Sequence, residues 1–391
     1  MFRKIGLLFT LLLAAPNAFT STPIKDWTVL VYWAVDNDLY DFSKPYFKQF
    51  EEAGTTEHIN VVVEYDYPGT RPTERILMSA HPQVVQEIQE TNSGDPKTLS
   101  DFYEWGVKKY PAHHVMPVIA SHGSNWSGVV LDHPTQKYMS MPELRSALQT
   151  MGKIKKPDLV LFDACRMSFF ETLSALDGLT DYMVGANFDL NGFDHTHPLQ
   201  YLAKNPKLSA QELGETYVRY YSRKPENASH AEMSASLLKP ENMKAFTSDL
   251  ENFFIFANHL PKAIKLKVLS TLYQSINEDQ DVAFDLFEVI RGFRKLSPQL
   301  VRFGNKLLIQ NGYFPEAPSF KTTLDDKNET IFLNHFPKNG KVQSVGFTTK
   351  TGSPSGLSIT CAHHAEAYAS VGSGLNTPAW NRLCSFWFPK K

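Results

Sequence analysis

Several features are scarce or missing in this sequence, and each absence excludes a class of protein. Neither sign of charge is in excess, because 39 Lys and Arg against 41 Asp and Glu leave a formal net charge of −2, so nothing points to nucleic acid or an anionic membrane as a partner. One long apolar run occurs, at the start, which excludes a multi-span membrane protein. No GxSxG, Walker A, HExxH or paired CxxC motif is present. The commonest serine hydrolases, phosphate-loop proteins and zinc sites are therefore not indicated, and we expect no catalytic metal.

What is present is a globular composition. The 391 residues are 42% apolar, 13% aromatic and 20% charged, which argues against disorder, collagen or coiled coil. At roughly 100–200 residues per domain, the length allows two or three small domains or one large α/β domain with appendages.

The N-terminus has the pattern of an export signal. Arg3 and Lys4 precede the apolar run Ile5–Ala15, and small residues around Ala18 suit a cleavage site. The alternative is an uncleaved membrane anchor, but about eleven apolar residues are short for a span of about 20. We expect a signal peptide over residues 1–18 and a mature protein that is periplasmic or secreted, without an integral membrane segment.

Cysteine is scarce too, and its count is odd. An oxidising compartment favours pairing, so three cysteines leave one thiol over. Cys361 and Cys384 lie in the last 31 residues and are candidates for a disulfide. Cys165 is the third, and a cysteine taken at random is most often a buried core thiol.

Apolar, β-branched runs alternate with helical patterns over residues 26–200, which predicts one α/β domain with a mostly parallel sheet covered on both faces. The expected strands are Trp27–Val35, Ile59–Tyr65, Val115–Ser121, Leu159–Phe162 and Tyr182–Ala186. The expected helices lie near 38–52, 97–110, 141–151 and 167–177. In such sheets, ligands bind at the carboxyl ends of the strands.

Two of these strands end on reactive side chains. The run Val115–Ala120 leads into Ser121, His122 and Gly123, and the run Asp158–Phe162 leads into Asp163, Ala164 and Cys165. The segment between them has room for a hairpin near 128–139 and a crossover helix. Adjacent parallel strands would then present an imidazole and a thiol side by side.

That pair suits acyl transfer. A thiol attacks as its thiolate, and an imidazole takes the thiol proton and later protonates a leaving amine. The N–H groups of Gly123 and Cys165 would form an oxyanion hole. The alternative for His122 is a hydrogen-bonded core histidine.

The motifs around these residues resemble the clostripain family of cysteine peptidases, relatives of caspases, gingipains and legumain. The matching segments are Trp27–Tyr32 with Asp36–Leu39, Ser121–Gly123 with Trp126, and Phe162–Met167, with weaker likeness at Tyr138–Leu144, Met233–Ala235, Asp285–Leu286 and Ser355–Ile359. The resemblance spans nearly all of the expected mature chain. It implies a caspase-like α/β/α sandwich and peptide-bond hydrolysis.

The resemblance also implies roles by matching position. Cys165 would be the nucleophile and His122 the general base and acid. Asp163 matches an acid at the floor of the S1 pocket, where it would pair with Arg or Lys at P1. Its alternative is a carboxylate that caps the helix expected near Met167.

Further elements of the family are matched less closely. Asp189 and Asp194 follow the strand after the cysteine and are candidate substrate contacts, although the family's Pro-Gly-Trp pattern is missing there. Family members often cleave themselves between histidine and cysteine. Lys137 is the basic residue that suits this cut, or else it is simply an exposed hairpin lysine. Some relatives require calcium, but no DxDxDG loop marks a site, so we expect no cofactor that the sequence can place.

Residues 201–391 are predicted to be a largely helical supporting region packed on the catalytic domain. Helical spacing covers 210–221, 240–259, 261–276 and 286–295, and short strands are expected at 343–348 and 357–360. The sequence thus predicts an exported, monomeric cysteine endopeptidase acting on proteins or peptides. The alternatives are a catalytically weak homologue that binds peptides or a partner, and a cysteine hydrolase or transpeptidase on other amides.

Overall fold

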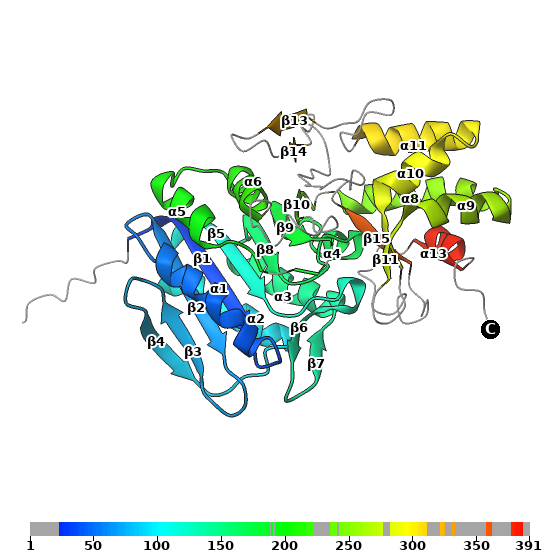
Figure 1. Cartoon of the computed structure of the whole chain (residues 1–391). Coiled ribbons are helices and arrows are strands. Elements are labelled where there is room, and N and C mark those ends of the chain that lie inside the picture. Colours follow the sequence, from blue (N-terminus) through cyan, green and yellow to red (C-terminus); the bar gives the residue numbers. More distant parts are fainter. Residues whose placement is uncertain are drawn as a thin grey trace, which may run out of the picture.

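Figure 1 shows the computed structural model of the chain. It describes residues 23–187, 189–190, 192–221, 235–240, 242–276, 282–310, 321–324, 330–333, 357–361 and 377–385. The expected signal peptide and the strand expected at 343–348 lie outside the described residues. None of the described helices is long and apolar enough to span a membrane.

The centre of the fold is an eight-stranded sheet in the order β10-β9-β8-β5-β1-β2-β3-β4. Its strands are β1 (Lys25–Ala34), β2 (Ile59–Asp66), β3 (Thr73–Leu77), β4 (Gln83–Ile88), β5 (Ala112–Ala120), β8 (Leu159–Asp163), β9 (Tyr182–Ala186) and β10 (Ala235–Leu238). The five strands β1, β2, β5, β8 and β9 run parallel, whereas β3, β4 and β10 are antiparallel to their neighbours, and β4 and β10 form the two edges. The mostly parallel sheet predicted from the sequence is confirmed.

Both faces of the sheet are buried, which explains the near-continuous apolar strands. In β1, Val29 and Val31 face one core, whereas Leu30 and Tyr32 face the other. Because successive side chains of a strand point to opposite faces, a strand covered on both sides must be apolar at every position.

Helices supply the two covering layers (Figure 1). On one face lie α1 (Tyr40–Ala53), α5 (Thr196–Lys204) and α6 (Ala210–Tyr221); on the other lie α2 (Pro96–Lys109), α3 (Met141–Ile154) and α4 (Phe170–Ala175). Local sequence sets where the helices begin. Asp95 accepts a hydrogen bond from the N–H of Lys97 at the start of α2, and Ser140 with Glu143 forms a capping box on α3.

Along the chain, a short 3-10 turn and a hairpin connect β5 to α3. It consists of η1 (Asn125–Ser127), β6 (Val129–Asp132) and β7 (Lys137–Met139). The hairpin expected near 128–139 is therefore present.

Most elements of the later part of the chain gather on the α4 side of the sheet (Figure 1). Its elements are α8 (Met243–Asn258), α9 (Lys262–Leu272), β11 (Tyr273–Ile276), β12 (Val282–Asp285), α10 (Leu286–Arg294), α11 (Pro298–Gln310), β13 (Lys321–Leu324), β14 (Thr330–Leu333), β15 (Ser358–Cys361) and α13 (Pro378–Cys384). Strands β11, β12 and β15 form a second, antiparallel sheet. Phe254 of α8 packs on Trp380 of α13, with ring centroids 4.8 Å apart.

Two contacts fasten this region. Cys361 and Cys384 form a disulfide with Cα atoms 5.4 Å apart, which links β15 to α13. The buried Glu171 of α4 accepts a hydrogen bond from the N–H of Thr360 in β15. The central sheet itself extends past residue 200, where the sequence suggests a domain end, because β10 at 235–238 is its edge strand.

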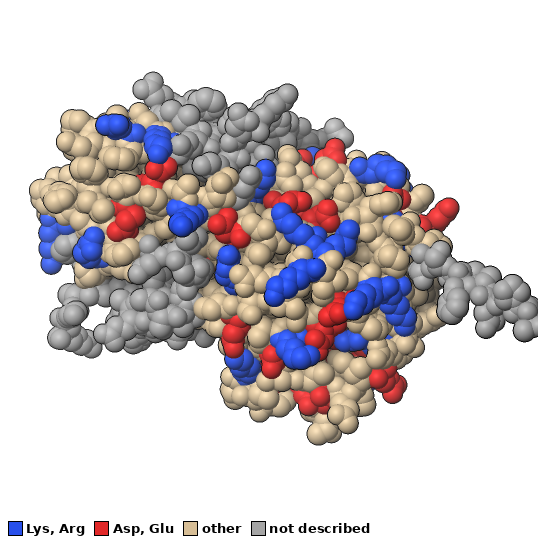
Figure 2. Space-filling view, turned by 180° about the vertical axis from the view of Figure 1, so that it is seen from behind, with Lys and Arg blue, Asp and Glu red and all other residues tan. Residues whose placement is uncertain are grey.

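The surface carries both signs of charge. Figure 2 shows Lys and Arg side chains interspersed with Asp and Glu on the face seen from behind. This mixture agrees with the balanced composition.

Candidate active site

The side chains of interest stand at the carboxyl ends of two neighbouring strands. Strand β5 ends at Ala120 and β8 ends at Asp163, and these two residues are partners in the parallel register. His122 therefore follows β5 at the level where Cys165 follows β8. The side-by-side arrangement expected from the two strand ends arises from this register.

Gly123 brings the two turns into direct contact. A Cβ atom built on Gly123 would lie 2.2 Å from the carbonyl oxygen of Cys165 and 3.1 Å from its nitrogen. Real Cβ atoms do not approach so closely, so glycine is required here by close packing of one backbone on the other. Within the described residues, the N–H groups of Gly123 and Cys165 have no protein acceptor. Both are thus free to donate to a ligand.

A carboxylate holds the far side of the imidazole. Nε2 of His122 lies 2.7 Å from Oδ1 of Asp38, in the turn after β1, and Nε2 of His133 is 3.6 Å from the same oxygen. The hydrogen bond from His122 lowers the pKa of Asp38, so this carboxyl is ionised at neutral pH. Because Nε2 is engaged with Asp38, Nδ1 is the nitrogen of His122 that remains for proton exchange. Sequence reasoning noticed Asp36–Leu39 as a matching segment but gave Asp38 no role.

Cys165 is a free, partly buried thiol. The N–H of Leu190 donates to its Sγ at 3.2 Å. Burial is the main influence on the pKa of Cys165 and raises it, and the hydrogen bond from Leu190 opposes this effect. Since a raised pKa leaves little thiolate at neutral pH, this cysteine needs a base to become a nucleophile.

The residue after the cysteine is strained. Arg166 has a φ of +56°, a conformation that residues other than glycine seldom adopt. Its side chain forms an ion pair with Asp189, with Nε 2.8 Å from Oδ1 and Nη2 3.2 Å from Oδ2. This bidentate pair fixes the turn that presents Cys165. Asp189, a candidate substrate contact, is thus engaged by Arg166.

A cavity of about 140 Å³ opens beside the imidazole and the thiol. His122 and Cys165 both line it, and Asp163 contributes the one carboxylate among its lining side chains. Its other walls are mostly apolar, and they include Trp33, Val35, Leu39, Phe42, Tyr46 and Leu190. The cavity therefore combines apolar walls with a single carboxylate among its lining residues.

Asp163 is held by its own network. Its Oδ1 accepts from the N–H of Phe193 at 3.1 Å, and its Oδ2 lies 2.8 Å from Nε2 of His195. The His195 ring is fully buried and stacks on Phe50, with centroids 4.3 Å apart. Asp163 therefore does not cap a helix near Met167, and α4 begins only at Phe170. Sequence reasoning missed His195 as the partner of Asp163.

Asp194 lies apart from the cavity walls. Its Oδ2 is 2.6 Å from Nδ1 of His197, and its Oδ1 accepts from the N–H of the same residue. Of the three acids proposed from the sequence to contact substrate, Asp163 alone is among the described residues that line the cavity.

Lys137 begins β7, where it forms an ion pair with Glu143. The next residue, Tyr138, reaches toward the site. Burial raises the pKa of its phenol, and the nearby Cys165 and Asp38 add to this effect. The Lys137–Tyr138 peptide bond thus belongs to the β6–β7 hairpin, which contacts the turn of His122, because the N–H of Val130 donates to the carbonyl of His122 at 2.9 Å.

Comparison with known proteins identifies the family of the chain. The sequence model of the clostripain family, peptidase family C11, matches residues 31–310. The chain therefore belongs to the clostripain family, and it is a cysteine peptidase. No curated protein sequence matches the chain.

Solved structures share the fold. An inactive zymogen C11 protease from Parabacteroides distasonis is 17% identical with a TM-score of 0.61, and the match covers 94% of this chain and 96% of that one. A secreted C11 cysteine protease from Bacteroides thetaiotaomicron, in complex with an irreversible peptide inhibitor, is 19% identical with a TM-score of 0.58 over 86% and 92% of the two chains. A second structure of a secreted C11 protease from that organism, iotapain, is 15% identical with a TM-score of 0.58 over 93% and 100%.

Proposed function

We propose that this peptidase is exported and hydrolyses peptide bonds after lysine or arginine, with Cys165 as nucleophile and His122 as general base and acid. The observation that carries the proposal is the contact between the two strand-end turns. Gly123 lies so close to the backbone of Cys165 that the imidazole and the thiol open into one cavity.

The first half of the reaction forms an acyl-enzyme. Nδ1 of His122 takes the proton of the Cys165 thiol, which its burial otherwise keeps protonated. The thiolate attacks the scissile carbonyl carbon, and the N–H groups of Gly123 and Cys165 donate to the oxyanion. The imidazolium then gives its proton to the leaving amine, and a thioester on Cys165 remains.

The second half releases the acid product. His122 takes a proton from water, whose oxygen attacks the thioester carbon, and the C–S bond breaks. The proton returns to the sulfur. Throughout, Asp38 on Nε2 keeps the ring oriented.

The cavity supports a basic P1 residue. Apolar walls suit the methylene stem of lysine or arginine, and Asp163 offers its carboxylate at the cavity wall. Its two oxygens accept from Phe193 and His195, and each oxygen retains a lone pair for the substrate cation.

A panel of peptide amides tests this proposal. Mature protein is assayed, with and without calcium, on matched substrates with Arg, Lys, norleucine or Asp at P1, beside Cys165→Ala and His122→Ala. We expect kcat/KM for Lys to exceed that for the uncharged norleucine at least about tenfold, and both variants to be inactive. Equal rates on Lys and norleucine would reject the basic preference alone. Turnover of none of the substrates would favour the peptide-binding alternative.

Export is proposed from the basic, apolar and small-residue pattern of residues 1–18. Expression in a secreting host, followed by N-terminal sequencing of the exported protein, tests it. A mature N-terminus just after residue 18 is expected. Retention of Met1 on a membrane-bound product would instead indicate the uncleaved anchor.

Self-cleavage after Lys137 is the second part of the proposal. The position of this bond in the hairpin that contacts the turn of His122 supports it. Intact-mass measurement of wild type beside Cys165→Ala is expected to give fragments ending at Lys137 in wild type only. Lys137→Ala should block the cut, whereas Lys153→Ala, an exposed lysine of α3, should not. A single full-length species in wild type would rule the cut out.

A further inference from the structure

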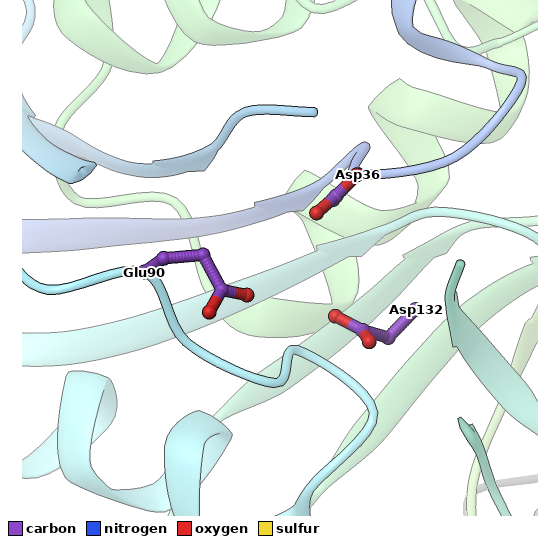
Figure 3. Close-up of side chains that lie close together, drawn as sticks. All are labelled: Asp36, Glu90 and Asp132. Atoms are coloured by element: carbon purple, nitrogen blue, oxygen red, sulfur yellow. The ribbon is translucent and has the colours of Figure 1, made fainter. Parts of the chain in front are cut away.

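Three carboxylates converge near the turn that holds Asp38, and one of their buried oxygens has no hydrogen-bond partner among the described residues. Asp36 follows β1, Glu90 follows β4 and Asp132 ends β6. One carboxylate oxygen from each lies within 4.8 Å of the other two. Figure 3 shows the three carboxylates turned toward a common space between these elements.

The two aspartates are buried. Asp36 is 3% exposed and Asp132 is fully buried, whereas Glu90 is exposed. Oδ1 of Asp36 accepts from the N–H of Gly69, but its buried Oδ2 has no hydrogen-bond partner among the described residues. A buried, unpartnered carboxylate oxygen that faces two further carboxylates is costly. A bound cation removes that cost.

Asp132 is oriented by its neighbours. Its Oδ1 accepts from the N–H and the hydroxyl of Ser93, at 3.2 Å and 3.4 Å, and its Oδ2 accepts from the N–H and the hydroxyl of Thr135, at 3.0 Å and 2.5 Å. These four donors fix the orientation of the carboxylate. Asp66 lies close by, and burial together with Asp36 and Asp132 raises its pKa to about 7.

From this geometry we infer that Asp36, Glu90 and Asp132 form a binding site for one calcium ion. The donors are all oxygens, which suits a hard cation, and the site lacks the histidine and cysteine ligands that zinc prefers. Two ligands on opposite sides of calcium are about 4.6–5.2 Å apart, at about 2.3–2.6 Å each, and the observed spacing fits within that span. Calcium readily completes its shell with water and backbone carbonyls, and the exposed Glu90 gives the ion a way in.

The site would tie together two segments that lie next to His122, the turn after β1 and the β6–β7 hairpin. The carbonyl of Asp36 accepts from the N–H of His133 at 2.9 Å, and Nδ2 of Asn37 donates to the carbonyl of Leu131 at 2.8 Å. Asp38, which holds the imidazole, is two residues beyond Asp36. An ion here fastens the turn after β1 to the β6–β7 hairpin.

The test measures binding on Cys165→Ala, so that it does not depend on peptidase activity or self-cleavage. The EDTA-treated protein is titrated with CaCl2 by calorimetry, and its thermal unfolding is followed in parallel. We expect one ion per chain and a calcium-dependent rise in Tm, with a smaller rise for Mg²⁺ at the same concentration. No heat and no rise in Tm would overturn the site, and an equal effect of Mg²⁺ would overturn its assignment to calcium.

The decisive variant is Glu90→Gln, because Glu90 is exposed and its loss leaves the fold intact, whereas Asp132 also holds Ser93 and Thr135. Calcium affinity is expected to fall about tenfold or more when one of three charged ligands is lost. Glu87→Gln, an exposed glutamate of the preceding strand, is the matched control and should bind like the parent. Equal calcium affinity of the two variants would show that exposed acids attract calcium without a specific site, and would overturn the proposal.

Discussion

At the scale of single residues, the carboxylate of Asp38 is the feature that distinguishes this site from a bare pair of cysteine and histidine. It is 70% exposed as a side chain, yet it contacts Nε2 of His122 at 2.7 Å. An exposed group of this kind has little to contribute to stability. Its position against the imidazole suits a positioning residue for the reaction.

We expect Asp38→Asn to lower kcat by roughly 10- to 100-fold, less than loss of the imidazole, since general acid–base catalysis contributes about 10²–10⁴-fold. KM should change little because Asp38 does not line the cavity. Asp38→Glu should restore part of kcat, which a purely structural role would not predict. Asp41→Asn, an exposed acid of α1 that pairs with Lys44, is the control, and an equal loss there would contradict the role of Asp38.

The second prediction at this scale concerns the pH dependence of Cys165. Burial raises the pKa of its thiol in the folded chain, whereas an unfolded chain has the ordinary value of about 8.5. In His122→Ala, alkylation by iodoacetamide should therefore have its midpoint at a higher pH when folded than in concentrated urea. Mass spectrometry reads the reaction cleanly, because Cys361 and Cys384 are disulfide-bonded. A folded midpoint at or below that of the urea-unfolded chain would contradict the prediction.

Some of these residues are accessible from sequence and others are not. His122 and Cys165 stand out because each directly follows an apolar strand, which is a local signal. Asp38 lies 84 positions from His122, and His195 lies 32 positions from Asp163. Contacts over such separations depend on how the strands pair, and no local pattern records them.

At the scale of elements, the close packing of the turns after β5 and β8 holds His122 and Cys165 beside each other. Gly123→Ala would push a methyl group into the backbone of Cys165, where the carbonyl oxygen is 2.2 Å away. We expect a loss of about 1–3 kcal/mol in the free energy of unfolding, as for other overpacked sites, and a large drop in kcat/KM because the two turns must move apart.

Urea unfolding and peptide hydrolysis measure the two effects. Gly152→Ala in α3 is the matched control, since its added Cβ meets nothing within 4 Å and alanine favours a helix. That variant should keep full activity and equal or higher stability. Full activity of Gly123→Ala would show that the contact between the turns is not needed.

The elements themselves differ in how far sequence predicts them. Strands β2 and β9 are expected at nearly their observed bounds, because buried parallel strands are continuous apolar runs. Strands β3 and β4 were not expected, since their sequences mix polar and apolar residues and form no continuous apolar run. Helix α4 is shorter than the expected 167–177, because the turn at Arg166 with positive φ delays its start to Phe170.

At the scale of the whole molecule, the elements after residue 200 belong to the same core as the catalytic sheet. Strand β10 closes one edge of the central sheet, and α8 packs beside α4 in the same core. Composition and helical spacing gave no sign of β10, because a strand of four residues is too short to show a clear pattern. The match of the solved structures over nearly the full chain accords with this continuity.

The disulfide supplies the last prediction, at this same scale. It closes a loop with a sequence separation of 23 and joins β15 to α13, which packs on α8 through Trp380 and Phe254. A loop of that length corresponds to about 2–4 kcal/mol of stabilisation. Cys165→Ala, which retains the disulfide, should therefore lose about this much free energy of unfolding when dithiothreitol reduces the bond, with the same loss in a further Cys361→Ala/Cys384→Ala variant. Dithiothreitol should leave that further variant unchanged. Finding free thiols at both positions in unfolded, unreduced protein would show that the bond does not form, and the cross-link would then contribute nothing to how the C-terminal helices are held against the catalytic sheet.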